Sequence, residues 1–366
     1  QIPELALKEF KTHDYLLNTI RGFNQDYLKI EVPQSLPTAI LVLVKGKNPQ
    51  RTIGYRADID ALPVNEKTNL PYASKNPNVM HACGHDIHMT VALGLLNYFS
   101  ENQPQDNLLF FFQPAEESES GGKQAYEKGI FHDEFKPDEF YGLHDNPALP
   151  AGAIGCRMGT LFAGTTEVNI DITGKSGHAA FPQNANDTVV AAASLIMQIQ
   201  TIISRSIDPI QSGVVTLGKI EAGTIRNVIA GHARIEGTIR GLTQKMIVQI
   251  DQRLKDICEG IARSYNLDVE LQLNQGGYWP VENNPELTKQ FISYIKNNPQ
   301  VNYVETAPAM TGEDFGFLLA KFPGVMFWLG VEDNSELHSA TLTPNESSIM
   351  RGIEAIKGFL IYRMEK

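Results

Sequence analysis

The chain contains little cysteine. Its 366 residues include three cysteines, Cys83, Cys156 and Cys258, which lie far apart in the sequence. An odd number of widely spaced cysteines argues against a disulfide framework and favours a reducing compartment. The N-terminus also lacks the basic and apolar regions of a signal peptide. We therefore expect a cytoplasmic protein.

Positive charge is scarce as well. The chain has 31 Lys and Arg against 42 Asp and Glu, which gives a formal net charge of −11. A nucleic-acid-binding protein needs a basic surface to neutralise phosphates, and no stripe of basic residues is present here. The composition therefore argues against nucleic acid as a partner.

Long hydrophobic runs are missing too. No apolar run approaches the roughly 20 residues that cross a bilayer, so we expect no membrane contact. The content of 42% hydrophobic and 20% charged residues is ordinary for a folded protein. A chain of 366 residues is longer than a typical domain with a single hydrophobic core, which suggests two domains.

Short β-rich runs alternate with helical patterns in the first and last parts of the chain. The runs AILVLVKG (39–46), NLLFFFQ (107–113) and GVMFWLG (324–330) read as strands, and residues 88–102 as a helix. Strands that are apolar throughout are typical of a sheet covered on both faces. These parts therefore predict an α/β domain with a central, mixed sheet.

The middle of the chain has a different pattern. Strand, helix, strand, strand, helix and strand are expected over residues 166–175, 186–206, 213–223, 227–242, 243–265 and 268–274. This order is the unit of a ferredoxin-like α+β domain. We therefore predict a discontinuous α/β domain of residues 1–163 and 276–366, with an inserted α+β domain of residues 164–275.

Polar residues cluster where the predicted strands of the α/β domain end. In an open α/β sheet, ligands bind beyond the carboxyl ends of the strands, so these residues can converge. Thiolate, imidazole and carboxylate groups together suit Zn²⁺, Mn²⁺, Co²⁺ or Ni²⁺, and five of them can serve one or two ions. The candidate ligands are Cys83, His85, Glu117, His144 and His338.

Simpler readings exist for each of these residues. Paired glutamates are mostly solvated surface, and a lone histidine is mostly structural. Asp58 is either a turn aspartate or a carboxylate that orients a ligand histidine. Cys83 could instead be a nucleophile paired with His81 or His85. That alternative leaves the glutamates and His144 unexplained, whereas a metal site accounts for all of them.

Several motifs resemble one known family. They are GYRADIDALPV, MHACGHDIHM, FFQPAEE, GLHDNP, GKSGHAAFPQNAND, AGTIRNVIA, TGEDFG and LHSATLTPNE, and in this order they extend over nearly the whole chain. The sequence resembles the metallo-amidohydrolases that include aminoacylases, hippurate hydrolase and auxin-conjugate hydrolases. The order and spacing of these motifs in the chain make the resemblance specific.

The resemblance implies residue roles and a substrate class. Glu116 would be the general base and Asp58 the carboxylate behind the metal site, although Glu116 and Glu117 could exchange roles. His178 and Asn227 would contact the carboxylate of an acylated amino acid or the developing oxyanion, in the same subunit or its partner. The inserted domain would be a lid that forms a homodimer.

The sequence also departs from its relatives. Asp145 follows His144 where relatives usually have an apolar residue, which could alter substrate preference or the choice of metal.

Three functions are compatible with these motifs. They are a deacetylase specific for one acetylated amino acid, a broader aminoacylase or hippurate hydrolase, and an inactive binding protein for acyl-amino acids. A thiol hydrolase is the reading with least support.

Overall fold

The computed structural model describes the whole chain, residues 1–366, and shows two compact units. The first unit comprises Gln1–Leu161, Val281–Pro308 and Asp314–Lys366. The second comprises Phe162–Pro280 and Ala309–Glu313. The α/β architecture with a central mixed sheet, together with an α+β second unit, confirms the predicted fold class. The predicted domain ranges themselves stay a prediction.

The first unit is built on an eight-stranded sheet with the order β1-β2-β4-β3-β5-β14-β6-β13. The strands are β1 (Leu28–Glu31), β2 (Ile40–Val44), β3 (Thr52–Asp58), β4 (Asn107–Gln113), β5 (Glu139–Asn146), β6 (Ile154–Cys156), β13 (Tyr303–Glu305) and β14 (Gly324–Gly330). Strands β4, β3, β5 and β14 run parallel, whereas β2 and β6 run antiparallel to their neighbours β4 and β14. The sheet is therefore mixed, with a parallel centre.

Both faces of this sheet are covered, which explains why its central strands are apolar throughout. The helices are α1 (Phe10–Arg21), α2 (His85–Glu101), α3 (Gly121–Glu127), α7 (Pro285–Asn297), α8 (Phe315–Leu319) and α9 (Ser347–Met364), with a 3₁₀ turn at Asp133–Phe135. Side chains of α1, α2, α7 and α9 share one core with side chains of β2, β4, β5 and β14. On the other face, Phe111, Phe131 and Phe140 form an aromatic cluster.

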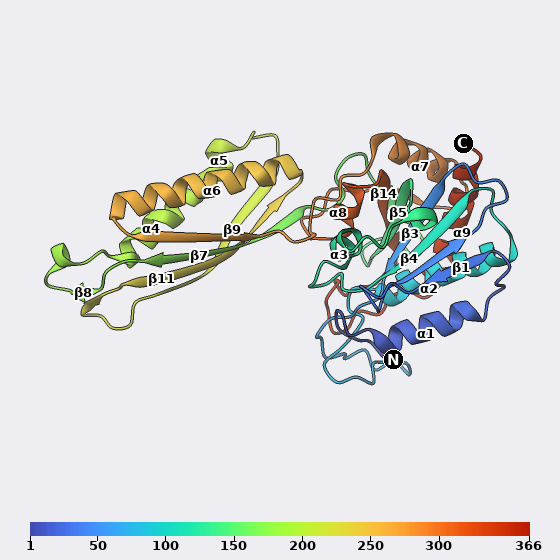
Figure 1. Cartoon of the computed structure of the whole chain (residues 1–366), viewed down its shortest axis with the longest axis horizontal. Helices are drawn as coiled ribbons and strands as arrows, with labels where there is room; N and C mark the ends of the chain where they lie inside the picture. Colours follow the sequence, from blue (N-terminus) through green and yellow to red (C-terminus); the bar gives the residue numbers. More distant parts are fainter. The chain divides into compact units, whose positions relative to one another are not determined.

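The second unit is a four-stranded antiparallel sheet in the order β12-β7-β11-β9. Its elements are β7 (Gly164–Thr173), β8 (Gly177–His178), α4 (Thr188–Ile199), α5 (Thr201–Ser206), β9 (Gly213–Ala222), β10 (Val228–Ile229), β11 (His232–Gly241), α6 (Gln244–Tyr265) and β12 (Asp268–Asn274), with a 3₁₀ turn at Pro182–Asn184. Helices α4 and α6 pack on one face of the sheet (Figure 1). This strand order and connectivity are those of the predicted ferredoxin-like unit.

The helices of the second unit form for local reasons that the sequence displays. Asp187 caps α4 by accepting the backbone N–H of Val189, and Thr243 caps α6 by accepting that of Met246. The buried residues of α6 recur every three or four positions and face the sheet. The 22-residue α6 then ends at Asn266, which adopts the left-handed conformation at φ 50°.

One stretch corrects the expectation that no apolar run is long enough to span a membrane. Residues Thr188–Ser206 have the length and composition of such a span. In the structure they form α4 and α5, and Leu195, Ile199 and Ile202 pack into the core of the second unit. We therefore interpret this stretch as a core helix pair.

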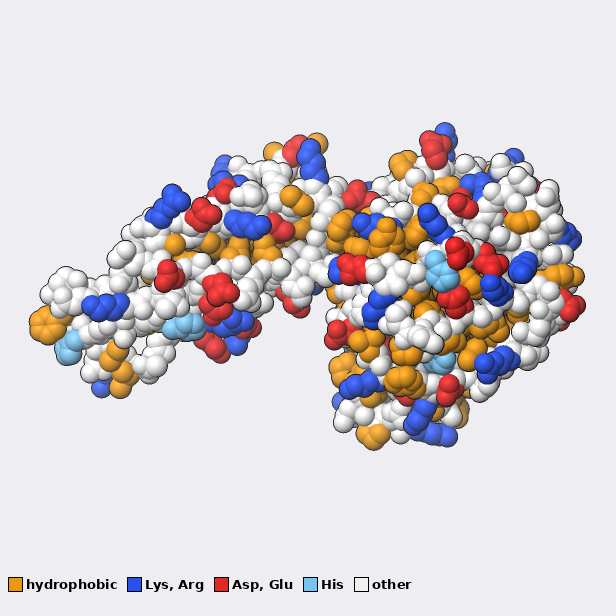
Figure 2. Space-filling view, viewed as in Figure 1, with side chains coloured by type: hydrophobic (Ala, Val, Ile, Leu, Met, Phe, Trp, Pro, Cys, Tyr) orange, Lys and Arg blue, Asp and Glu red, His pale blue; other side chains and the backbone are white.

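Element boundaries differ from the sequence expectations in several places. Helix α2 begins at His85 and not at residue 88, and the predicted helix 186–206 divides at Gln200. The segment 223–231, predicted as a turn and strand, contains the separate two-residue strand β10, which pairs with β8. The surface drawn in Figure 2 has acidic and basic side chains interspersed, without a block of one sign.

Candidate metal centre

The candidate centre lies where the parallel strands of the first unit end. Asp58 is the last residue of β3, and His144 lies near the end of β5. Glu116 and Glu117 follow β4, and His338 belongs to the segment after β14. The structure therefore brings together side chains from positions 58 to 338, at the edge of the sheet where ligands of α/β proteins bind.

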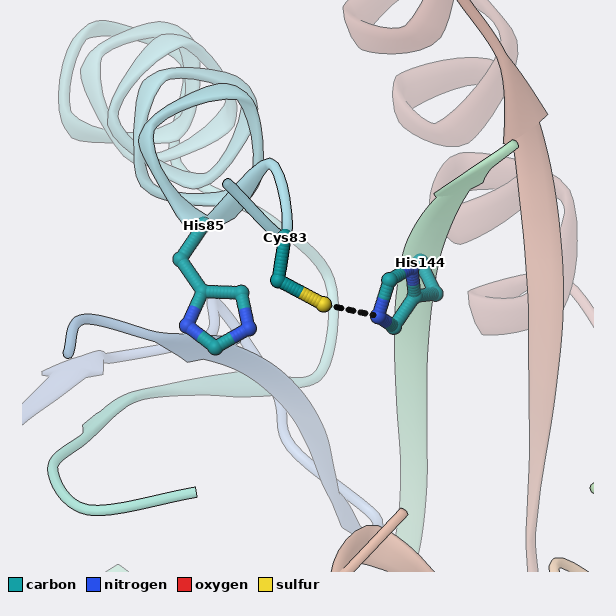
Figure 3. Close-up of side chains that lie close together, drawn as sticks. All are labelled: Cys83, His85 and His144. Carbon is teal, nitrogen blue, oxygen red and sulfur yellow. Dashed lines mark hydrogen bonds between the residues drawn. The ribbon is translucent and has the colours of Figure 1, made fainter. Parts of the chain in front are cut away.

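The Cys83 sulfur occupies the middle of this cluster. It lies 3.5 Å from Nε2 of His144 and 3.3 Å from Nε2 of His338. Figure 3 shows the sulfur directed toward His144, with His85 on the other side of Cys83 at the start of α2. The Glu117 carboxylate completes the set, 3.6 Å from Nε2 of His85 and 3.8 Å from Nε2 of His338.

Backbone carbonyls fix the orientation of two of the imidazoles. Nδ1 of His85 lies 2.9 Å from the carbonyl oxygen of Asp60, and Nδ1 of His144 lies 2.9 Å from that of Asp145. An Nδ1–H that donates to a carbonyl leaves Nε2 without a proton, with its lone pair available to a metal. Each ring therefore presents a ligand atom to the cluster.

Unpaired buried atoms test whether these residues fit an ion. Nε2 of His85 and Oε1 of Glu117 are both buried and have no hydrogen-bond partner. Burial raises the pKa of the Glu117 carboxyl, and it raises the pKa of the Cys83 thiol well above its usual range. A buried polar atom without a partner is costly, and a divalent cation would satisfy these atoms together. The donor set therefore fits one or two divalent ions.

A network of buried charges lies behind the cluster. Arg56 has no exposed side-chain surface, and it donates to Asp58 Oδ2 at 2.7 Å and to Asp314 Oδ1 at 3.0 Å. Burial alone would raise the pKa of Asp58, but Arg56, and then His85 and His88, hold that pKa well below its usual range. Asp58 therefore stays ionised next to the centre.

The histidine that Asp58 orients is His88. Nδ1 of His88 lies 2.5 Å from Asp58 Oδ1, whereas the nearest atom of His85 lies 3.5 Å from Asp58 Oδ2. The other ring nitrogen of His88 accepts the backbone N–H of Asp145 at 3.0 Å. From the sequence, His88 is expected to support the site or to begin the helix, and not to bind metal. Its hydrogen bond to Asp58 and its position in the first turn of α2, three residues after His85, agree with that expectation.

Asp145, which could alter substrate preference or the choice of metal, lies against two histidines at the site. The residue is fully buried, and its carboxylate faces the rings of His88 and His144 at 3.1 and 3.3 Å. Asp145 is therefore placed to influence the centre through these histidines.

His178 and Asn227 lie in the second unit, next to one another. His178 pairs with Val228 in the β8–β10 ladder, and Ala179 donates its N–H to the Asn227 carbonyl at 3.2 Å. Nδ1 of His178 accepts the N–H of Ala180 at 3.1 Å, so Nε2 of the neutral ring carries the proton. The exposed His178 side chain therefore offers a hydrogen-bond donor.

An α/β unit with a buried cluster of thiol, imidazole and carboxylate groups, joined to a ferredoxin-like unit, is typical of a class of metal-dependent hydrolases. The model of peptidase family M20/M25/M40 matches residues 54–362. The chain belongs to this family.

Relatives of the chain match it along its whole length. A protein named N-acetyldiaminopimelate deacetylase from Lactobacillus helveticus (strain DPC 4571) is 80% identical over 365 residues, which cover 100% of this chain and 95% of the relative. A protein of the same name from Limosilactobacillus reuteri (strain DSM 20016) is 78% identical, with coverage of 100% and 96%.

A solved structure supports the same architecture. The Bacillus subtilis YXEP protein, described as a dinuclear metal-binding peptidase from the M20 family, is 28% identical. It superimposes with a TM-score of 0.87 over 100% of this chain and 95% of its own chain.

Proposed function

We propose that the protein hydrolyses the acetyl amide of N-acetyl-L,L-2,6-diaminopimelate to L,L-diaminopimelate and acetate, a step of lysine biosynthesis. The observation that carries this proposal is the sequence identity of 80%, over the whole chain, to a protein named for this deacetylation. The buried cluster with unpaired ligand atoms supports an amidohydrolase in general. We place the enzyme in the cytoplasm, which the three unpaired cysteines support.

Cys83, His85, Glu117, His144 and His338 would hold one or two divalent ions, of Zn, Mn, Co or Ni. When bound, such ions polarise an amide carbonyl and make water acidic enough to attack at neutral pH. Cys83 then acts as a ligand and not as a nucleophile. Its thiol has a raised pKa because it is buried, whereas reactive cysteines have a lowered pKa.

Glu116 is the proposed general base. Its side chain is 5% exposed, and Oε1 accepts the backbone N–H of Asp314 at 3.2 Å, which fixes the carboxylate. Glu116 takes a proton from the attacking water and delivers it to the departing amine, because an amine leaves poorly unless protonated. His178 and Asn227 would donate to the substrate carboxylate or the developing oxyanion.

The substitution Glu116→Gln should retain metal and lose turnover by about 10²- to 10⁴-fold, the usual contribution of a general base. Metal content by elemental analysis and kcat on N-acetyl-L,L-diaminopimelate measure the two effects. Glu127→Gln is the control, since Glu127 is exposed on α3 and pairs with Lys123. Full activity of the Glu116 variant would contradict the assignment of the base.

The substrate is tested by kcat/KM for N-acetyl-L,L-diaminopimelate, hippurate and N-acetyl-methionine on metal-loaded enzyme. A strong preference for the first supports the proposal. A preference for either of the others would indicate a broader aminoacylase or a hippurate hydrolase. Hydrolysis of none of them would favour a binding protein for acyl-amino acids.

We also propose a homodimer formed through the second unit. Strand β9 is an edge strand of the four-stranded sheet, and α4 packs beside it. Val190 and Met197 on α4 are 51% and 70% exposed, and Ile220 on β9 is 50% exposed. An edge strand with neighbouring exposed apolar side chains is suited to pair with its own copy across a two-fold axis.

A further inference from the structure

The segment that presents Glu116 and Glu117 is strained. Ala115 and Ser120 both have positive φ, at 59° and 54°. A Cβ at Gly121 would lie 1.7 Å from the carbonyl oxygen of Pro114, so the segment also folds tightly on itself. Non-glycine residues remain in such conformations only when their surroundings enforce them.

Three buried carboxylates enforce this conformation through backbone N–H groups. Glu9 accepts the N–H of Ala115 at 2.9 Å, and Asp60 accepts that of Glu117 at 3.0 Å. Asp314 accepts the N–H of Gly122 at 2.8 Å. The three carboxylates come from distant parts of the chain and hold the segment at its start, middle and end.

Glu9 differs from the other two. Asp314 accepts from Arg56, and Asp60 Oδ1 lies 3.3 Å from Nδ1 of the proposed ligand His85, whereas Glu9 pairs with no charged side chain. Its side chain is completely buried, and Oε1 also accepts the N–H of Leu7 at 2.9 Å, while Oε2 has no partner. Burial raises the pKa of Glu9 to about 7. An apolar side chain would fill the same space at lower cost. The hydrogen bonds are therefore what Glu9 contributes.

We infer that Glu9 is a positioning residue, which fixes the direction of Glu116 and Glu117 by holding the backbone of Ala115. The catalytic part of this inference rests on the proposed amide hydrolysis. Glu9 itself forms no hydrogen bond or ion pair with the ligand side chains or the proposed base. It acts through the turn that carries them.

The test compares two replacements of similar size. Glu9→Met fills the space and removes the acceptor, and Glu9→Gln keeps an acceptor oxygen. For Glu9→Met we expect kcat to fall by as much as about 10²-fold with KM little changed, because a small misplacement of a catalytic group has effects of this size. Glu9→Gln should recover most of kcat. Glu9→Ala serves as a second acceptor-free variant if Glu9→Met does not fold.

Glu139→Met is the matched control for loss of a buried carboxylate. Glu139 is 4% exposed, pairs with Arg363 at 2.7 Å, and begins β5 at the end opposite His144. This control should lower the melting temperature without lowering kcat per folded molecule. An equal loss of kcat in Glu139→Met and Glu9→Met would overturn the positioning role.

Hydrogen exchange gives a readout that is independent of activity. In Glu9→Met, with and without added Zn²⁺, the amides of residues 114–122 should exchange faster, whereas in Glu139→Met they should not. Unchanged exchange in that segment overturns the inference. If the unsubstituted enzyme hydrolyses no amide, the proposed function fails, while the exchange result still decides whether Glu9 holds the segment.

Discussion

Arg56 carries a charge in a place where water has no access. Its guanidinium donates to Asp58, Asp314 and Gln113, and all four side chains are fully buried. A buried ion pair contributes little net stability compared with apolar packing, but removing one partner leaves an uncompensated charge. The guanidinium therefore matters chiefly because it keeps Asp58 ionised beside the centre.

Arg56→Met should destabilise the metal-free protein by about 3–5 kcal/mol at pH 7. Because the folded-state pKa of Asp58 is lowered, its contribution is complete above the unfolded pKa of about 4 and is lost as the pH falls. The difference between the two proteins should therefore shrink on acidification. Urea unfolding at pH 7 and at about pH 2.5, well below the unfolded pKa, measures this difference in unfolding free energy.

Arg51→Met is the comparison for this experiment. Arg51 is 21% exposed and pairs with Asp106 at 3.0 Å, so Arg51→Met should lower the free energy of unfolding at pH 7 by less than Arg56→Met does. A difference in unfolding free energy for Arg56→Met that is small at pH 7, or that stays constant down to about pH 2.5, would contradict the role given to the guanidinium.

Sequence reasoning predicted the members of the cluster better than their supports. Glu117, His144 and His338 stand out because metal-binding residue types follow apolar strands, and Cys83 and His85 stand out because they share one short loop. Glu9 and Asp314 do not stand out, since each works through a backbone N–H more than 100 positions away. A residue that bonds to backbone leaves no pattern of residue types in the sequence, so only the folded chain shows it.

At the scale of elements, Gly84 determines how α2 begins. It precedes His85 with φ at 80°, and a Cβ there would lie 2.2 Å from the carboxylate of Asp145. The sequence predicted this helix from residue 88, because periodicity does not show that the loop glycine already starts the helix. The first turn of α2 therefore carries both His85 and His88.

Gly84→Ala should displace the Asp145 carboxylate and, with it, the support of His88. We expect metal affinity to fall by about 10- to 100-fold, as when groups behind a metal site are lost. The melting temperature should fall as well, because φ is unfavourable for alanine. Metal titration and thermal unfolding measure the two effects.

Gly260→Ala provides the opposite case. Gly260 lies within α6, where a Cβ would meet nothing within 4 Å, so alanine should stabilise the helix by about 0.5–1 kcal/mol.

For the Gly84→Ala experiment, an unchanged metal affinity would mean that Asp145 and His88 do not support the centre.

The strands that the sequence did not predict are short or lie at an edge. β6 and β13 have three residues each, and β1 has four and lies at the end of the sheet. Alternation needs several residues to be recognised, so such strands become visible only through their pairing partners. The long apolar strands β4 and β14, in contrast, were predicted with their observed bounds.

At the scale of the whole molecule, the proposed dimer can be broken at one position. Met197→Glu should place a charge in the apolar surface of α4 and shift the protein from dimer to monomer in analytical ultracentrifugation. Met350→Glu is the matched control, because Met350 is 61% exposed on α9 of the first unit. A dimer that survives Met197→Glu, or an unsubstituted monomer, would contradict the proposed interface.

The strand order of the first unit has a consequence for synthesis on the ribosome. Strand β14 lies between β5 and β6, although more than 160 residues separate it from either strand along the chain. A nascent chain that has emerged as far as residue 300 therefore lacks β14, the strand that connects β5 to β6 in the main sheet, and it also lacks His338. The second unit, with all its strands between residues 164 and 274, can fold during that interval. The second unit can therefore fold early during synthesis, whereas the metal centre can form only after the last part of the chain has emerged.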